Sequence, residues 1–308
     1  MKAIILAGGS GSRLYPLSKV SSKQLQAVYD KPMIYYPLTV LIAAGIREFC
    51  IITTPHDLPR FQALLGDGTQ WGIAIEYRSQ PRPEGIGQAF LIAEDFVAGE
   101  NVVLMLGDNI FFGGDAFPRA VSEFRSGAAI FAYQVKSPER YGVVEFDRDG
   151  KAISIEEKPQ EPRSSFAVPG IYIYDGRVVD IAKTIRPSAR GELEITDINR
   201  AYLQIGELHV RRLNRGFVWL DAGTSSTLQE ASAYIETVER RQGVKLGCPE
   251  EAALVRGFLS LERFRALLAD IPACEYRDYL AEVAVEADRH RRQSSSSADH
   301  VNVLKNPI

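Results

Sequence analysis

Residues 2–25 read KAIILAGGSGSRLYPLSKVSSKQL and give the first indication of the fold. The apolar run at residues 2–7 predicts a buried strand, and the glycines after it predict a tight turn. Glycines let backbone N–H groups approach a ligand closely, and Arg13 brings a fixed positive charge to the same place. We therefore expect a phosphate-binding loop, although a strand and turn without any ligand would also fit these residues taken alone.

Three well-known glycine motifs do not fit this loop. The dinucleotide motif G-x-G-x-x-G has Leu14 at its third glycine, and the P-loop motif fails because no Gly-Lys pair follows Gly8. The hydrolase motif G-x-S-x-G nearly matches around Ser10, but Ser12 replaces its last glycine. The four histidines carry no local signature of a catalytic partner. These mismatches disfavour both a dehydrogenase and a serine hydrolase.

The composition narrows the class of protein. With 308 residues, 45% of them hydrophobic, the chain can form one large domain or two small ones. A net charge of −3 offers no basic surface for nucleic acid. The three cysteines lie far apart and predict neither a zinc site nor a disulfide framework. No apolar run is long enough to span a membrane, and a strand is predicted from residue 2, so we expect a cytoplasmic protein without a signal peptide.

Strand and helix patterns alternate through the first half of the chain. This alternation predicts an α/β fold with a doubly wound, mostly parallel, Rossmann-like sheet, whose ligands bind beyond the carboxyl ends of the strands. A β-rich region then predicts a partly antiparallel extension that carries substrate contacts, and FVWLD (217–221) is expected to pair with HVRRLN (209–214). The expected strands are 2–7, 48–53, 73–78 and 101–106, followed in the extension by 128–135, 141–146, 152–157 and 166–175.

Three parts of the chain are expected. Residues 1–242 should form the core with its ligand-binding parts. Residues 243–288 should form a C-terminal helical segment. Residues 289–308 are polar and serine-rich, which predicts a disordered tail.

Two carboxylates stand just past predicted strands. Asp108 follows VVLMLG and Asp221 follows VWL. Each alone could be a helix cap or a turn former. Together, in a fold with a phosphate loop, they suit Mg²⁺, which one or two carboxylates usually hold with phosphates and waters.

Several cations could meet the same phosphates. Lys158 ends the string EEK and precedes a proline, but charge strings of this kind are commonly solvated surface. Lys23 lies ten residues after Arg13 and could equally be a solvated loop residue. Arg190 could instead form an ion pair at a helix start with Glu192 or Glu194.

From Lys2 to about Leu261 the chain resembles the sugar nucleotidyltransferases, and within them the enzymes that join dTTP to glucose 1-phosphate. The ordered matches are LAGGSGSRL, SKQL, VYDKPMIYYPL, LGDGTQWG, GQAF, LGDNIF, ERYGVVEFD, EEKP, ARGELEITDINR and WLDAGT. The resemblance implies a nucleotide-binding core that condenses a nucleoside triphosphate with a sugar 1-phosphate, uses Mg²⁺ and releases pyrophosphate. It also implies a role in deoxysugar synthesis, for example of dTDP-rhamnose.

The resemblance assigns roles to the matched residues. The triphosphate would be wrapped by Gly8, Gly9, Ser10, Gly11, Ser12 and Arg13, supported by Lys23 and Gln24. Gln80 and Gly85 would contact the base. Asp108 and Asp221 would bind Mg²⁺. Lys158, assisted by Arg190, would hold the attacking phosphate. The sugar site would be lined by Asn109, Tyr141, Gly142, Glu157 and Val168. Arg13, Lys23, Asp108 and Lys158 would therefore form the catalytic set.

The residues themselves agree with this chemistry. A sugar phosphate is already an anion and can attack the α-phosphorus without a general base, so the protein must hold two anions in line and neutralise charge. Departures from the usual family pattern at Ala27, Ile86, Gly87, Pro169 and Ala222 leave the sugar open. Another sugar 1-phosphate, or UTP in place of dTTP, remains an alternative, as does a catalytically inactive regulatory homologue.

The resemblance also implies an oligomer. Family members are often homotetramers with a second nucleotide site at a subunit interface. Residues 243–260, GVKLGCPEEAALVRGFLS, match the region that helps to form it. Feedback by a dTDP-sugar is therefore a hypothesis, and a simple helical cap on the core is the alternative.

Overall fold

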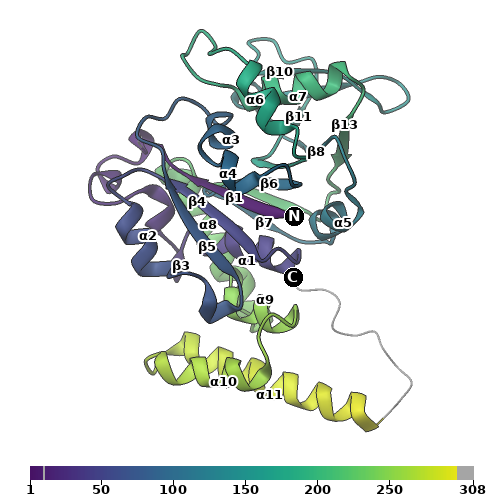
Figure 1. Ribbon diagram of the computed structural model, residues 1–308. Coiled ribbons are helices and arrows are strands. Elements are labelled where there is room, and N and C mark those ends of the chain that lie inside the picture. The colour runs from purple at the N-terminus through teal and green to yellow at the C-terminus, as the bar shows by residue number, and fades with distance from the viewer. Residues whose placement is uncertain (10, 297–308) are drawn as a thin grey trace.

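A computed structural model describes residues 1–9 and 11–296 (Figure 1). Ser10 of the predicted phosphate loop and positions 297–308 of the predicted tail lie outside these described residues. A large mixed sheet runs through the middle of the molecule with helices on both faces. The elements β10, β11, α6 and α7 lie at one end, and α10 and α11 lie at the other.

The predicted parallel half of the sheet is confirmed. β1 (Lys2–Ala7) lies between β4 (Glu48–Thr53) and β6 (Val102–Leu106), parallel to both, and β5 (Ala74–Ser79) extends the sheet beyond β4. The apolar runs suit this position because a parallel sheet is covered on both faces.

The predicted antiparallel extension is also present. β12 (Ile171–Tyr174) is antiparallel to both β6 and β8 (Ala128–Gln134). The sheet continues through three strands that pair antiparallel with their neighbours: β11 (Phe166–Ala167), β9 (Gly142–Phe146) and β10 (Ala152–Glu157).

The expected pairing of HVRRLN with FVWLD is wrong. β13 (Leu208–Arg212) joins β8 in parallel, whereas β14 (Val218–Asp221) forms a separate antiparallel ribbon with β7 (Asn109–Phe112). Adjacent strands in the chain often pair, but here each finds a partner far away in the sequence. The β7–β14 ribbon matters most for function because it carries residues of the site.

Alternation along β1 separates two hydrophobic layers, since successive side chains of a strand point to opposite faces. Ala3 and Ile5 pack in one layer, whereas Ile4 and Leu6 pack in the other. The first layer contains side chains of α1 (Tyr35–Ala43), α2 (Leu58–Leu65), α5 (Ala116–Glu123), α9 (Pro249–Val255), α10 (Leu261–Asp270) and α11 (Glu275–Ser296). The second contains side chains of α3 (Gln88–Ile92), α4 (Glu94–Val97), α6 (Val178–Thr184) and α7 (Ile195–Gln204).

A third, smaller cluster joins the N-terminal region to a long helix. It contains side chains of the β7–β14 ribbon and of α8 (Ser225–Gln242), together with Val28 of β2 (Ala27–Val28), which pairs with β3 (Lys31–Pro32). Short 3₁₀ helices complete the described elements: Ser12–Leu14, Leu17–Lys19, Lys23–Leu25, Thr69–Trp71 and Pro138–Arg140.

The C-terminal boundary differs from the expectation. α8 ends at Gln242, the last residue of the predicted core, but residues 289–296 continue α11 and are not an irregular tail. Two side-chain contacts lie along this part of α11: His290 Nε2 lies 3.5 Å from Glu286 Oε1, one turn earlier, and Arg265 of α10 lies 3.5 Å from Asp288.

Two further expectations concern thiols and membranes. Cys50 and Cys248 are buried free thiols, and Cys274 is an exposed one. Within the described residues, the helices are either too short or too polar to cross a lipid bilayer.

Candidate active site

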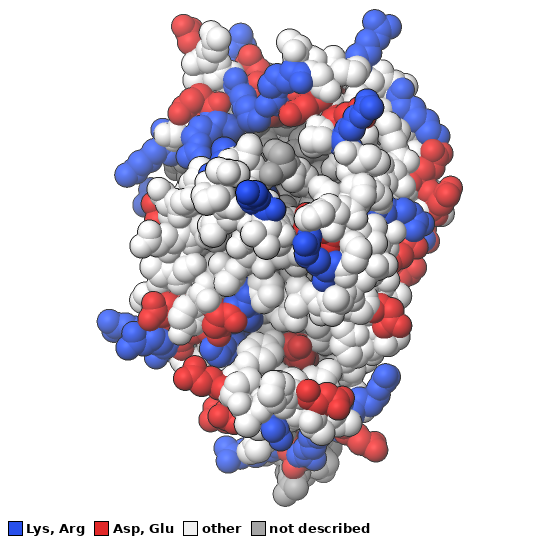
Figure 2. All heavy atoms as spheres, turned by 90° about the vertical axis from the view of Figure 1, so that its left-hand side faces the viewer, with Lys and Arg blue, Asp and Glu red and all other residues white. Residues whose placement is uncertain are grey.

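The candidate site opens at the carboxyl ends of β1 and β6, where an α/β sheet is expected to bind ligands. The two strand ends are joined by a hydrogen bond from Gly107 N to Leu6 O at 3.0 Å. Figure 2 shows a hollow in the upper half of this face with Lys and Arg side chains around it. A cavity of about 460 Å³ lies at this site. Its lining includes nine of the predicted residues: Arg13, Asp108, Asn109, Tyr141, Gly142, Glu157, Lys158, Val168 and Asp221.

The β7–β14 ribbon brings the two predicted metal ligands together. Asp221 is the register partner of Asn109, and Ala222 N donates to the Asp108 carbonyl at 3.3 Å. Among the described residues, no group of three or more His, Cys, Asp or Glu side chains could hold a metal. A pair of carboxylates fits Mg²⁺, which completes its octahedral shell with phosphate oxygens and water.

Asp108 is paired with a cation. Lys23 Nζ donates to Asp108 Oδ2, and Asn109 Nδ2 donates to Oδ1 at 3.0 Å. Burial disfavours the charged carboxylate, but the Lys23 ammonium and these hydrogen bonds outweigh it, so the pKa of Asp108 lies below its usual value. The carboxylate is therefore ionised at neutral pH.

Asp221 is also surrounded by donors. Tyr141 OH donates to Oδ2 at 3.4 Å, and an Arg140 nitrogen lies 3.8 Å from the same oxygen. A Cβ on Gly223 would lie 2.6 Å from Asp221 Oδ1 and 3.2 Å from Arg13 Nη2. Only a glycine leaves room there for the Arg13 guanidinium and the carboxylate to lie close together.

The glycine loop lies against the predicted base contact. A Cβ on Gly8 would lie 2.4 Å from Gln80 Oε1, and Gly9 and Gly11 have positive φ values of 106° and 56°. Gln80 is buried, and its amide nitrogen donates to Gln88 Oε1 at 2.7 Å. These glycines let the loop turn tightly beside the Gln80 amide.

Other residues predicted to bind the nucleotide do not line the cavity. Ser12 begins a 3₁₀ turn, and Gln24 is buried with its Cγ 3.0 Å from the place of a Cβ on Gly107. Gly85 has φ 103°, and a Cβ there would lie 2.4 Å from the Leu193 carbonyl oxygen. Gln24, Gln80 and Gly85 therefore lie around the site, but they are not among the residues that line the cavity.

The sugar-side residues form a hydrogen-bonded wall. Asn109 Oδ1 accepts from Gly170 N at 3.0 Å and from Trp219 Nε1 at 2.7 Å. Thr196 Oγ1 donates to Glu157 Oε2 at 2.5 Å. A Cβ on Gly142 would lie 3.1 Å from Thr196 Oγ1, so glycine keeps this corner open.

Lys158 has an unusual backbone conformation. Its φ is +44°, although it precedes a proline, which normally favours extended backbone. Its N–H donates to the Tyr141 carbonyl at 3.0 Å, and its ammonium lies 3.6 Å from Glu157 Oε1. A left-handed non-glycine residue costs free energy, and such residues concentrate at functional sites.

Arg190 forms the ion pair with Glu194 that was the alternative to a phosphate contact. Its guanidinium binds Glu194 at 2.8 Å and lies 3.4 Å from both Glu192 and Glu157. Burial opposes the charge, but these carboxylates outweigh it and raise the pKa of Arg190. Arg190 does not line the cavity, although it reaches Glu157, the neighbour of Lys158.

Among the cavity residues that had no predicted role are Arg140, Thr196, Asn199 and Trp219. All four stand inside matched motifs, ERYGVVEFD, ARGELEITDINR and WLDAGT. Thr196 and Asn199, three apart on α7, share a face of that helix with Ile195, and this spacing was the available signal.

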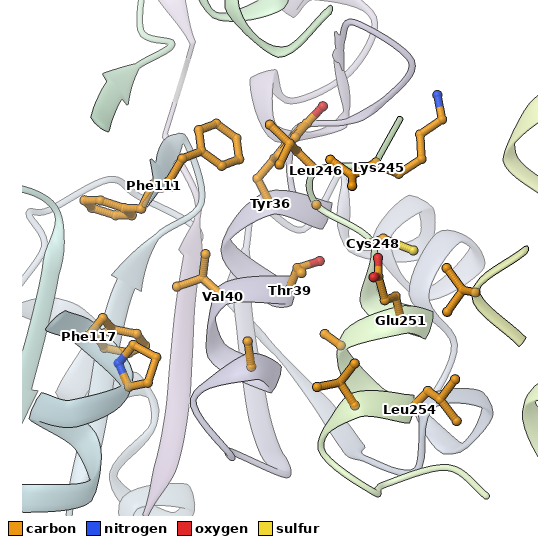
Figure 3. A pocket seen from close by; sticks show the side chains of 18 of the residues that line it. Tyr36, Thr39, Val40, Phe111, Phe117, Lys245, Leu246, Cys248, Glu251 and Leu254 are labelled. Carbon is orange, nitrogen blue, oxygen red and sulfur yellow. The ribbon is translucent and has the colours of Figure 1, made fainter. Parts of the chain in front are cut away.

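A second cavity of about 620 Å³ lies between α1, β7 and the C-terminal helices (Figure 3). Its wall is mostly apolar, with Val40, Phe111 and Leu254 among the lining residues, and it also contains Thr39 and Glu251. Residues 244–248 contribute to it, and they belong to the segment predicted to help form a second nucleotide site.

Comparisons with known proteins agree on one family. The family model described as nucleotidyl transferase matches residues 2–238. A glucose-1-phosphate thymidylyltransferase of Xanthomonas campestris pv. campestris (strain B100) is 53% identical over 292 residues, covering 94% of this chain and 99% of that protein. The enzyme of the same name from Neisseria meningitidis serogroup A is 53% identical over 283 residues, covering 91% and 98%.

Solved structures share the fold. A Bacillus anthracis protein to which the same activity is assigned, crystallised with a sucrose, is 45% identical with a TM-score of 0.71, covering 76% of this chain and 94% of that one. A UDP-glucose pyrophosphorylase complexed with UDP-glucose has a TM-score of 0.68 at 21% identity, covering 77% and 98%. At that identity the likeness concerns the fold alone.

Proposed function

Since this chain belongs to the nucleotidyl transferase family, we propose that it condenses dTTP with α-D-glucose 1-phosphate to dTDP-glucose and pyrophosphate. One observation carries the proposal: a single cleft joins Arg13 and the two carboxylates to Lys158 and the sugar-side wall. Relatives that are about half identical over nearly their whole length carry this activity in their names.

The cleft suits an in-line displacement. The acceptor phosphate is already an anion, so the protein needs no general base and instead must position two anions and neutralise charge. Lys158, at the sugar-side wall, would hold the attacking phosphate. Arg13 and the glycine loop would hold the triphosphate and stabilise the departing pyrophosphate. A serine or cysteine nucleophile has no step to perform.

Lys23 and Asp108 would act as a pair. Without substrate, the Lys23 ammonium neutralises the Asp108 carboxylate. The triphosphate would offer Lys23 a second anionic partner and free Asp108 for a cation.

Nucleotidyl transferases are generally Mg²⁺-dependent, and the two carboxylates fit that ion. Asp108 and Asp221 would hold it, and Mg²⁺ bound there would neutralise charge on the phosphate oxygens. Arg140 and Tyr141 would keep Asp221 oriented through their contacts with Oδ2.

Pyrophosphate release tests the proposal. The chain is incubated with Mg²⁺ and every pairing of dTTP, UTP, dCTP or dATP with glucose 1-phosphate, galactose 1-phosphate or mannose 1-phosphate. We expect the highest kcat/KM for dTTP with glucose 1-phosphate. A preference for UTP or for another sugar would replace the substrate but keep the chemistry. An absence of release with every pair would support an inactive homologue.

The oligomer, the effector site and the cytoplasmic location remain proposals. The apolar second cavity and its contribution from residues 244–248 support a second ligand site. Equilibrium binding of dTDP-glucose beside dTTP tests it. We expect dTDP-glucose to bind two sites per chain and dTTP to compete for only one of them. A single dTDP-glucose site from which dTTP displaces all of the ligand would contradict this. Mass photometry measures the mass of the assembly and so tests the proposed homotetramer.

A further inference from the structure

Asn199 combines complete burial with an unpaired donor. Its side chain is fully buried on α7. Oδ1 accepts a hydrogen bond from Tyr174 OH at 2.5 Å, but Nδ2 has no hydrogen-bond partner among the described residues. Among the described residues, a few other buried side-chain atoms also lack a hydrogen-bond partner, but only Asn199 of that group lines the catalytic cleft.

The amide is held in place by its surroundings. The Tyr174 ring packs edge-on against Phe90 with ring centroids 5.4 Å apart, and it lies tilted against Tyr202 with centroids 5.6 Å apart. The Tyr174 hydroxyl is thus fixed, and it fixes the orientation of the Asn199 amide.

The position of Asn199 belongs to the sugar side of the cleft. Thr196, one turn earlier on α7, bonds Glu157, and Tyr172 lines the same wall. A buried amide donor that stays unpaired is costly, so such a group is expected to find a partner in a ligand or a water. Sugar hydroxyls accept hydrogen bonds from amides in this way.

We propose that Asn199 Nδ2 donates a hydrogen bond to one hydroxyl of the acceptor sugar and so helps to select the sugar. This inference rests on the proposed function and adds a recognition residue to it. Asn199 acts on the sugar ring, whereas Lys158 acts on the phosphate. Losing Asn199 should therefore change sugar discrimination and leave dTTP binding alone.

The test compares wild type with the double variant N199L/Y174F. Leucine keeps much of the asparagine volume, and phenylalanine removes the hydroxyl that would otherwise lose its partner. Y174F alone is the matched control, because it keeps the Asn199 donor. Each protein is assayed with glucose 1-phosphate and with glucose 1-phosphates that each lack one hydroxyl.

We expect wild type to lose about 10- to 100-fold in kcat/KM with one of the deoxy sugars. N199L/Y174F should lose a similar factor with glucose 1-phosphate and then treat that one deoxy sugar and glucose alike. Y174F should retain the discrimination, and the KM for dTTP should stay the same in all three proteins.

Two results separate the two proposals. If wild type is active and N199L/Y174F discriminates every deoxy sugar as wild type does, the Asn199 inference is overturned and the function stands. If wild type releases no pyrophosphate with any sugar 1-phosphate, both are overturned. Melting temperatures are measured first, and Asn199→Ala replaces the double variant if the latter does not fold.

Discussion

Lys158 gives the sharpest test at the residue scale, because a phosphate contact and a solvated surface charge predict different effects of removing it. Its ammonium lies 3.6 Å from Glu157 Oε1, and its backbone is held in a left-handed conformation. Lys158→Met should lower turnover with glucose 1-phosphate by about a hundredfold, the scale of one preorganised electrostatic group. Steady-state pyrophosphate release measures this loss.

The affinity for dTTP should change much less, because Arg13 and the glycine loop are proposed to hold the triphosphate. Lys151→Met, at an exposed position, is the control and should match wild type. Wild-type turnover in Lys158→Met, or a loss confined to dTTP binding, would show that the lysine has another partner.

A substitution of Asp108 tests whether this carboxylate is a ligand of Mg²⁺. Asp108→Asn keeps the shape and the contact with Asn109 but removes the charge that attracts a hard cation. Activity should fall by at least a hundredfold, and residual activity should need much more Mg²⁺. Titration of pyrophosphate release against Mg²⁺ measures both effects. An unchanged Mg²⁺ dependence, beside Asp149→Asn as the exposed control, would exclude Asp108 as a ligand.

At the residue scale the sequence located the charges but not their partners. Motif position was enough to predict that Arg13, Asp108, Lys158 and Asp221 lie in one cleft, as they do. It could not show that Lys23 neutralises Asp108, since the two lie 85 residues apart. Nor could it show that Asn199 has an unpaired donor, because burial and pairing depend on the packed structure.

At the scale of elements, the β7–β14 ribbon shows that a sequence pattern can identify a strand without identifying its partner strand. Apolar alternation identified FVWLD as a strand, but alternation does not name the partner strand. Its pairing with β7 places Asp221 beside Asn109 and so creates the pair of carboxylates. The parallel core was easier to predict because its strands are long, apolar and separated by helical patterns.

A partly buried charge cluster ties the β2–β3 ribbon to the end of α8. Lys31 Nζ binds Asp30 and lies 2.9 Å from Glu239 Oε1, and Lys245 binds Asp30 and lies 3.1 Å from Glu239 Oε2. Burial opposes ionisation of Asp30, but the two lysines outweigh it and hold the pKa of Asp30 below its usual value. The ionised carboxylate therefore stabilises the folded chain.

Because the pKa of Asp30 is depressed on folding, its contribution is complete above its unfolded value and is lost as the pH falls through the folded value. Asp30→Asn should lower the free energy of unfolding by about 1–3 kcal/mol at pH 7, and the difference from wild type should vanish in acid. Urea unfolding over a pH series measures it. A pH-independent difference would contradict the charge mechanism, and Asp270→Asn, at an exposed position, is the control.

For the molecule as a whole, the C-terminal helices belong to the main core. Residues 243–288 were predicted to form a C-terminal helical segment, and Leu261, Phe264, Leu280 and Ala284 of that segment are buried in the same cluster as Phe49 of the central sheet. Glu250 fixes this junction: it accepts from Trp71 Nε1 at 3.1 Å and from Tyr276 OH. Sequence pattern found the helices but could not show which surface they cover.

Removing α10 and α11 should therefore unfold more than those two helices. Fully burying one Leu or Phe side chain stabilises a protein by about 1.5–3 kcal/mol, and the whole chain is expected to have only about 5–15 kcal/mol of stability. A chain ending at Gly257 should lose its cooperative thermal transition by circular dichroism, whereas Val285→Ser, at an exposed position of α11, should melt like wild type. If the truncated chain melted cooperatively at the wild-type temperature, the helices would be a separable appendage and the core would be complete without them.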